Sequence, residues 1–160
     1  MARLSVLAFA AASKRVGVVY LEGNRLLFWQ MSTYAGIDHA FAEKFAKRMI
    51  KRWQPDVIVT ERADQARRKG ARTKAIITTL TNVADDSPML SVAIERRQRH
   101  RNKYKEAAAL AERHPHLARI KLKPRRVFDD EPRATVVFEA VALAESVKEG
   151  PIGRAAATER

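Results

Sequence analysis

The order of the apolar segments is the feature that most limits how this chain can fold. Three strand-like runs come first, at about residues 4–10, 15–21 and 25–31, and the second of them is rich in Val and Tyr. The turn between the second and third runs contains Gly23 and Asn24, which both accept a positive φ. The chain therefore predicts an antiparallel meander of three strands near its N-terminus.

Helical and strand-like segments alternate after this meander. From Ile37 to Trp53 a large apolar residue recurs at every fourth position, which predicts an amphipathic helix that Pro55 ends. Further elements are expected at about residues 56–60 (strand), 71–83 (helix), 89–94 (strand), 103–113 (helix) and 130–147 (helix). Strands that first pair antiparallel and then alternate with helices predict an α/β fold, with a mixed five-stranded sheet flanked by helices.

Two glutamates interrupt apolar segments of this pattern. Glu61 ends the run Val57-Ile58-Val59-Thr60, and Glu139 is the only charged residue between Ala134 and Ala144. A buried carboxylate is costly unless a cation pairs with it, so the two glutamates suggest a metal site. The alternatives are a strand-end acid paired with Arg62 for Glu61, and a carboxylate bridged to an arginine inside the fold for Glu139.

The charge is large, positive and unevenly distributed. The net charge is +13, and residues 96–126 hold 12 basic against 2 acidic residues, while residues 62–74 hold 6 against 1. Residues 127–149 reverse the sign, with 6 acidic and 2 basic residues. Such local excess favours a polyanionic partner, above all nucleic acid, over a charge run that only solvates the surface.

Several classes of site and location are excluded or disfavoured by composition. The absence of cysteine excludes disulfides, thiolate zinc sites and cysteine nucleophiles, and six unclustered glycines exclude a phosphate-binding loop. His114 follows a predicted helix and is expected to cap it or to be solvated. The N-terminal apolar run is expected to be a strand rather than a signal peptide, which favours a cytoplasmic protein. The length predicts one domain over residues 1–150, followed by a disordered tail at 151–160.

Three segments resemble those of RuvC-type Holliday-junction endonucleases, a branch of the ribonuclease H-like superfamily. The run from Val6 to Gly17 resembles the opening of these enzymes, with Ser13 and Gly17 in register. Pro55-Asp56-Val57-Ile58-Val59-Thr60-Glu61 resembles the strand that delivers a catalytic glutamate, and Phe138-Glu139-Ala140-Val141-Ala142-Leu143-Ala144 resembles the final helix. The resemblance spans nearly the whole chain and implies the ribonuclease H-like fold.

The chain departs from the family at two acidic positions. The first catalytic aspartate of the family falls on Ala10, and a second acid of the final helix falls on Val136. Ala10 fits either a degenerate relative or a substitution that disables the enzyme. The resemblance therefore implies a protein that binds DNA but cleaves it poorly.

The resemblance also implies the chemistry of the site. Hydrolysis would use two Mg²⁺ or Mn²⁺ ions about 3.5–4 Å apart, held by carboxylates from separate elements. Glu61 and Glu139 would be metal ligands, and Lys105 or Lys103 would lie near the scissile phosphate. Asp130 or its neighbours Asp129 and Glu131 would add another ligand, unless they serve only as acids at the start of the last helix. The candidates for DNA contact are Arg67, Arg68, Lys69, Arg72, Lys74, Arg96, Arg97, Arg99, Arg101, Lys103 and Tyr104.

The function implied is a structure-selective endonuclease that resolves branched DNA as a homodimer. A different class of function remains open, in which the protein is a pseudo-nuclease that grips structured nucleic acid without cutting it. A weaker alternative is a transposase-like or RNA-processing nuclease of the same fold.

Overall fold

A computed structural model describes residues 4–66, 69–95, 109–115 and 135–149. The strands are β1 (Ser5–Ala12), β2 (Arg15–Glu22), β3 (Arg25–Ser32), β4 (Val57–Glu61) and β5 (Leu90–Ile94). The helices are α1 (His39–Trp53), the 3₁₀ turn η1 (Ala63–Gln65), α2 (Ala71–Asp86) and α4 (Thr135–Glu149), and residues 109–113 are also helical.

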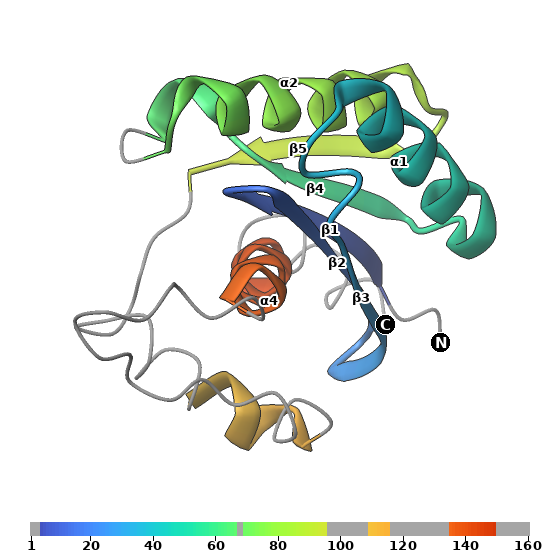
Figure 1. The fold of residues 1–160 in the computed structure, drawn as a ribbon. Helices are drawn as coiled ribbons and strands as arrows, with labels where there is room; N and C mark the ends of the chain where they lie inside the picture. Colours follow the sequence, from blue (N-terminus) through green and yellow to red (C-terminus); the bar gives the residue numbers. More distant parts are fainter. Residues whose placement is uncertain (1–3, 67–68, 96–108, 116–134, 150–160) are drawn as a thin grey trace, which may run out of the picture.

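All strands belong to one mixed sheet with the order β3-β2-β1-β4-β5 (Figure 1). β1 pairs antiparallel with β2, and β2 pairs antiparallel with β3, which forms the expected meander. β4 pairs parallel with both β1 and β5. The prediction of a mixed five-stranded α/β fold is therefore confirmed.

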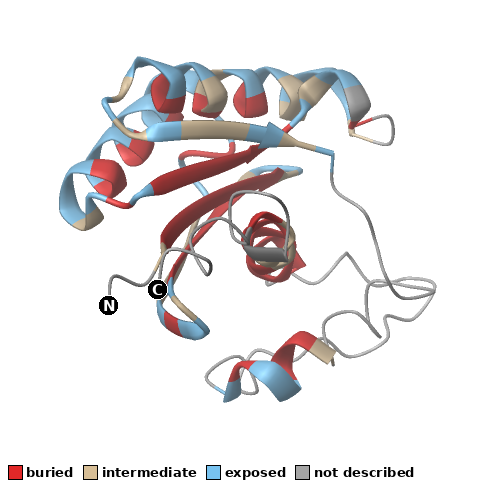
Figure 2. Cartoon of the chain, turned by 180° about the vertical axis from the view of Figure 1, so that it is seen from behind, coloured by how far each residue is buried: buried red, intermediate tan, exposed pale blue. Residues whose placement is uncertain are grey.

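Helices cover both faces of this sheet. α1 and α2 pack together on one face, and α4 crosses the other face against β1 and β2 (Figure 1). Side chains of β1 alternate between the two layers, so that Val6, Ala8 and Ala10 face α4 while Leu7 and Phe9 face α1 and α2. The central strands are consequently buried along their length (Figure 2).

The buried face of α1 differs from the predicted stripe. Phe45 and Met49 are buried, but Ile37 precedes the helix and is 50% exposed, as is Phe41. Because a helix has 3.6 residues per turn, residues spaced four apart shift steadily around its surface. The first residues of the predicted stripe therefore point away from the sheet. Ala42, Ala46 and Ile50 complete the buried face of α1.

The close packing of α4 on the sheet depends on the absence of a side chain at Gly17. This glycine pairs with Ala10 across β2 and β1, and a Cβ built on it would lie 2.9 Å from the carbonyl oxygen of Val136. Real Cβ atoms essentially never approach that closely. Gly17 thus allows α4 to lie directly on the sheet, which sets the position of Glu139.

The N-terminal apolar run forms part of the central strand β1, as its pattern predicted. Within the described ranges, none of the helices is both long enough and apolar enough to cross a membrane. The predicted tail at 151–160 lies outside the described residues.

Candidate carboxylate site between the sheet and helix α4

Glu61 and Glu139 meet in the layer between the sheet and α4. Glu61 is the last residue of β4, and it shares its strand face with Val57 and Val59, which pack against α4. Glu139 lies in the second turn of α4. Their exposed fractions are only 6% and 8%, so both carboxylates need a partner.

The shared partner is the ammonium group of Lys69. Its Nζ atom lies 2.7 Å from Glu61 Oε2, 2.9 Å from Glu139 Oε2 and 2.7 Å from the carbonyl oxygen of Ala11. A lysine ammonium has three donors, and here each one meets an oxygen acceptor. Lys69 therefore joins the ends of β1 and β4 to α4 through one nitrogen atom.

This arrangement differs from both structural alternatives that the sequence left open. Arg62 bonds with Asp64, at 2.9 Å between Arg62 Nη2 and Asp64 Oδ2, and not with Glu61. The partner found for Glu139 is a lysine rather than an arginine. Lys69 is one of the predicted DNA contacts, and in the structure its ammonium group pairs with the two carboxylates.

The two positions where the family would carry further acids are apolar and buried. Ala10 is 1% exposed and faces α4. Ala8 pairs with Val59 across β1 and β4, so Ala10 and Glu61 each lie two residues further along adjacent parallel strands. Val136 is fully buried against Gly17. Ala10 therefore lies level with Glu61 on the neighbouring strand, and the residue at position 10 carries no polar side chain.

The oxygen atoms that accept hydrogen bonds from Lys69 are also suitable ligands for a single hard cation. Two carboxylates and a backbone carbonyl are ligand types that Mg²⁺ and Mn²⁺ accept, provided that the ammonium withdraws. No group of three or more His, Cys, Asp or Glu side chains able to hold a metal ion occurs among the described residues. Glu61 and Glu139 thus fit one divalent ion, and they do not by themselves fit a pair.

Two of the predicted DNA contacts other than Lys69 lie within the described residues. Arg72 is exposed in the first turn of α2, and Lys74, half-buried, follows it, so both lie close in sequence to Lys69. The remaining candidates lie outside the described residues: Arg67, Arg68, Arg96, Arg97, Arg99, Arg101, Lys103, Tyr104, Lys105, Asp129, Asp130 and Glu131.

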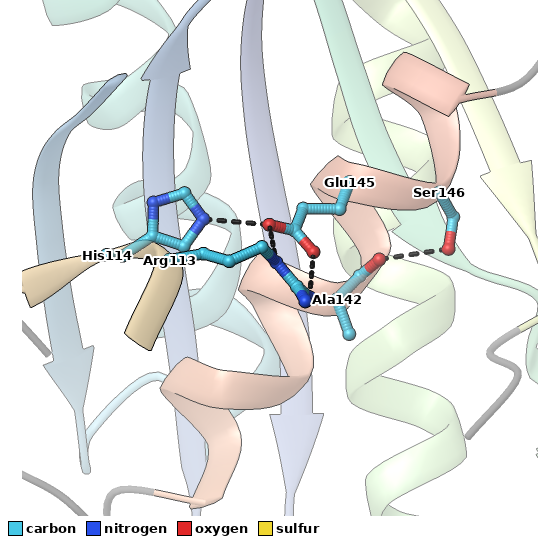
Figure 3. Close-up of polar contacts among 5 residues, drawn as sticks. All are labelled: Arg113, His114, Ala142, Glu145 and Ser146. Carbon is cyan, nitrogen blue, oxygen red and sulfur yellow. Dashed lines mark hydrogen bonds and ion pairs between the residues drawn. The ribbon is translucent and has the colours of Figure 1, made fainter. Parts of the chain in front are cut away.

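A third acid, the partly buried Glu145, joins α4 to Arg113 and His114 (Figure 3). Arg113 donates two hydrogen bonds to it, at 3.2 Å from Nε and 2.7 Å from Nη2, and His114 Nε2 lies 2.8 Å from its Oε1. His114 is 5% exposed, so the expectation that it caps a helix or is solvated is wrong. Burial raises the pKa of Glu145, but the hydrogen bonds from His114 and Arg113 outweigh it and lower the pKa to about 2.

The lowered pKa of Glu145 makes this contact sensitive to acid. Because the folded pKa lies below the ordinary 4.5, the stabilisation is complete above pH 4.5 and is lost as the pH falls towards 2. We expect Glu145→Gln to lower the free energy of unfolding by about 2 kcal/mol at pH 7, and by almost nothing near pH 2. Urea unfolding of the unmodified protein and of Glu145→Gln between pH 7 and pH 2 measures this difference in the free energy of unfolding.

The matched control is Glu43→Gln. Glu43 pairs with Lys47 on the exposed face of α1, and its pKa is also lowered, mainly by the hydrogen bond from Lys47. Solvent screens such a pair, so the free energy of unfolding should differ much less between Glu43→Gln and the unmodified protein. A difference for Glu145→Gln that stays constant from pH 7 to pH 2 would show that the acid is only a packing group.

Comparison with known proteins identifies the fold on which this site lies. No protein-family model and no curated protein matches the sequence. The structure is similar to fowlpox virus resolvase in complex with Holliday-junction DNA, with a TM-score of 0.60 and 13% identity over 91% of this chain and 97% of the other.

Two structures of RuvC from Thermus thermophilus are similar as well. The complex with a Holliday-junction substrate has a TM-score of 0.59 and 13% identity, over 88% of this chain and 90% of that one. The second RuvC structure has a TM-score of 0.53 and 16% identity, over 88% and 91%. The chain therefore has the ribonuclease H-like fold in the form found in RuvC-type Holliday-junction resolvases.

Proposed function

We propose that this protein binds branched DNA and is a metal-dependent, structure-selective endonuclease of the resolvase type, impaired by alanine at position 10. The observation that carries the proposal is the convergence of Glu61 and Glu139 on one cation beside Ala10. These side chains come from a strand end and from a helix packed across it, both rigid elements. The carboxyl ends of strands in open α/β sheets are where ligands usually bind.

The residues of this chain would divide the work as follows. Glu61 and Glu139 would hold Mg²⁺ or Mn²⁺ through their carboxylate oxygens, and Asp130 is the candidate for a further ligand. The bound ion would supply Lewis acidity and an activated water for phosphodiester hydrolysis. Lys105 would lie near the scissile phosphate. Ala10 offers neither charge nor an oxygen ligand, so cleavage would be slow.

The proposed substrate rests on charge and on the fold. The net charge of +13 favours a polyanion, and two of the similar structures were solved with Holliday-junction DNA. Exposed Arg72 and the neighbouring Lys74 follow the carboxylate site directly and would contact phosphates there. A homodimer and a cytoplasmic location remain predictions from the sequence.

A second candidate, a pseudo-nuclease that binds branched DNA without cutting it, is favoured by a specific observation. Lys69 already neutralises the carboxylate pair, and both missing acid positions are apolar. In this case Glu61 and Glu139 would serve to hold α4 on the sheet.

A panel of substrates tests the proposal and separates the two candidates. We expect a four-way junction to bind at least about tenfold more tightly than duplex DNA or an RNA–DNA hybrid in EDTA, with affinity falling steeply as salt rises. With Mn²⁺, the endonuclease should cut the junction slowly, and Glu61→Gln should abolish the cut. Gel-shift and denaturing-gel assays measure both steps.

The outcomes are distinct. Equal affinity for all three nucleic acids would contradict a branched-DNA protein. Junction binding without any cut, unchanged by Glu61→Gln, would establish the pseudo-nuclease instead. Arg72→Ala tests the proposed phosphate contact separately from the carboxylate site. It removes one exposed cation and leaves Glu61, Glu139 and Lys69 unchanged.

A further inference from the structure

We propose that Lys69 is a tethered counter-ion that fills the carboxylate pair, so that the protein folds without metal and any divalent ion must displace it. The inference rests on the proposed function in one respect, namely that Glu61 and Glu139 form the metal site. It gives the site a built-in inhibitor that the family resemblance did not imply.

The coordination of Lys69 is complete. Its three donors meet Glu61, Glu139 and the Ala11 carbonyl at 2.7–2.9 Å, the range of charge-assisted hydrogen bonds. Its side chain is 17% exposed. A lysine used for phosphate contact would present its donors to solvent, whereas this one has none left to present.

Burial of the two carboxylates makes the ammonium a strong stabiliser of the metal-free fold. The side chains of Glu61 and Glu139 are only 7% and 11% exposed. Without Lys69, two like charges would face each other in a poorly solvated layer, and loss of one partner from a buried pair is strongly destabilising. A divalent cation could take over the same neutralisation through the same oxygen atoms.

The ammonium and a divalent ion exclude each other. Both need the oxygens of Glu61 and Glu139, and their like charges repel strongly at such short range. Withdrawal of Lys69 requires no change in the sheet or α4, because it sits on a flexible stem in the connection between η1 and α2. Its neighbour Gly70 has open space around the position of a Cβ.

The test compares Lys69→Met with the unmodified protein in the absence of DNA. In EDTA we expect the variant to unfold about 10 °C lower. Mn²⁺ should restore most of that loss, and electron paramagnetic resonance should show Mn²⁺ binding at least about tenfold tighter than in the unmodified protein. If the variant folds only when Mn²⁺ is added, this also supports the proposal, because Mn²⁺ then replaces the ammonium completely.

Two matched controls isolate the contact. Lys74→Met removes a half-buried lysine one turn into α2, and it should change neither stability in EDTA nor Mn²⁺ affinity by a comparable amount. In a Glu61→Gln/Glu139→Gln background, Lys69→Met should lose both of its effects. An effect that persists there would mean that Lys69 acts on some other group.

The lack of cysteine in the chain allows a chemical rescue. Lys69→Cys carries a single thiol, and alkylating it with 2-bromoethylamine under denaturing conditions restores an ammonium at nearly the same distance. After refolding, this product should regain stability in EDTA and lose tight Mn²⁺ binding, whereas the iodoacetamide adduct should do neither.

Equal Mn²⁺ affinities for the unmodified protein and Lys69→Met would overturn the proposal, as would a loss of stability that neither Mn²⁺ nor aminoethylation repairs. Neither result depends on DNA. Failure here therefore leaves the substrate panel intact, and failure of junction binding would leave this competition unaffected.

Discussion

Ala10→Asp should raise Mn²⁺-dependent cleavage of a four-way junction by about 100-fold or more, the scale on which metal sites respond to changes in their ligand shell. The side chain at position 10 faces α4 and lies level with Glu61 on the adjacent parallel strand. A carboxylate there would become a third acidic group in the cluster around Lys69. Time courses on denaturing gels with labelled junctions measure the gain.

Ala10→Asn is the control for this gain, because it reproduces the shape of aspartate without its charge. It should leave cleavage near the level of the unmodified chain. In EDTA, Ala10→Asp should unfold at a lower temperature than Ala10→Asn, since one ammonium would then face three carboxylates. Equal cleavage by both variants would show that the nuclease site lies elsewhere.

Gly17→Ala should lower the free energy of unfolding by about 2 kcal/mol, and Gly17→Val by about 4 kcal/mol. A Cβ at this position would lie 2.9 Å from the Val136 carbonyl oxygen and 3.1 Å from its Cγ1 atom. The obstacle includes backbone, which yields less easily than the end of a side chain. Helix α4 would have to move off the sheet and carry Glu139 away from Lys69.

Gly70→Ala provides the comparison for a change of the same size. No atom lies within 4 Å of a Cβ built on Gly70, and its φ of −71° suits any residue. Its effect should stay within about 0.5 kcal/mol, since a weaker helix cap offsets a less flexible unfolded chain. Equal losses for the two alanine variants would mean that α4 does not approach the sheet closely at Gly17.

Most of the fold could be predicted because its signals are local. Short apolar runs marked each strand of the meander, and the predicted bounds agree with β1–β3 to within two residues. The run before Glu61 identified β4 as a strand with both faces covered. The prediction for α1 was wrong in its buried face and placed its start two residues too early. Residues spaced four apart do not stay on one face of a helix with 3.6 residues per turn.

The site was only partly accessible from sequence. An acid inside an apolar segment marked Glu61 and Glu139, and the structure brings them together, although their role as metal ligands stays a prediction. Lys69 was indistinguishable from its basic neighbours, because its role depends on how the connection after β4 turns back. The contact of Glu145 with Arg113 and His114 joins segments about thirty residues apart and left no local pattern.

The position of α4 has a consequence for synthesis on the ribosome. β1 lies in the middle of the sheet and precedes the other four strands in the sequence, whereas α4, the helix that covers its second face, follows all five strands. A nascent polypeptide that stops before Thr135 would leave the row formed by Val6, Ala8, Val57 and Val59 open to water. Fragments released before α4 is made should therefore aggregate.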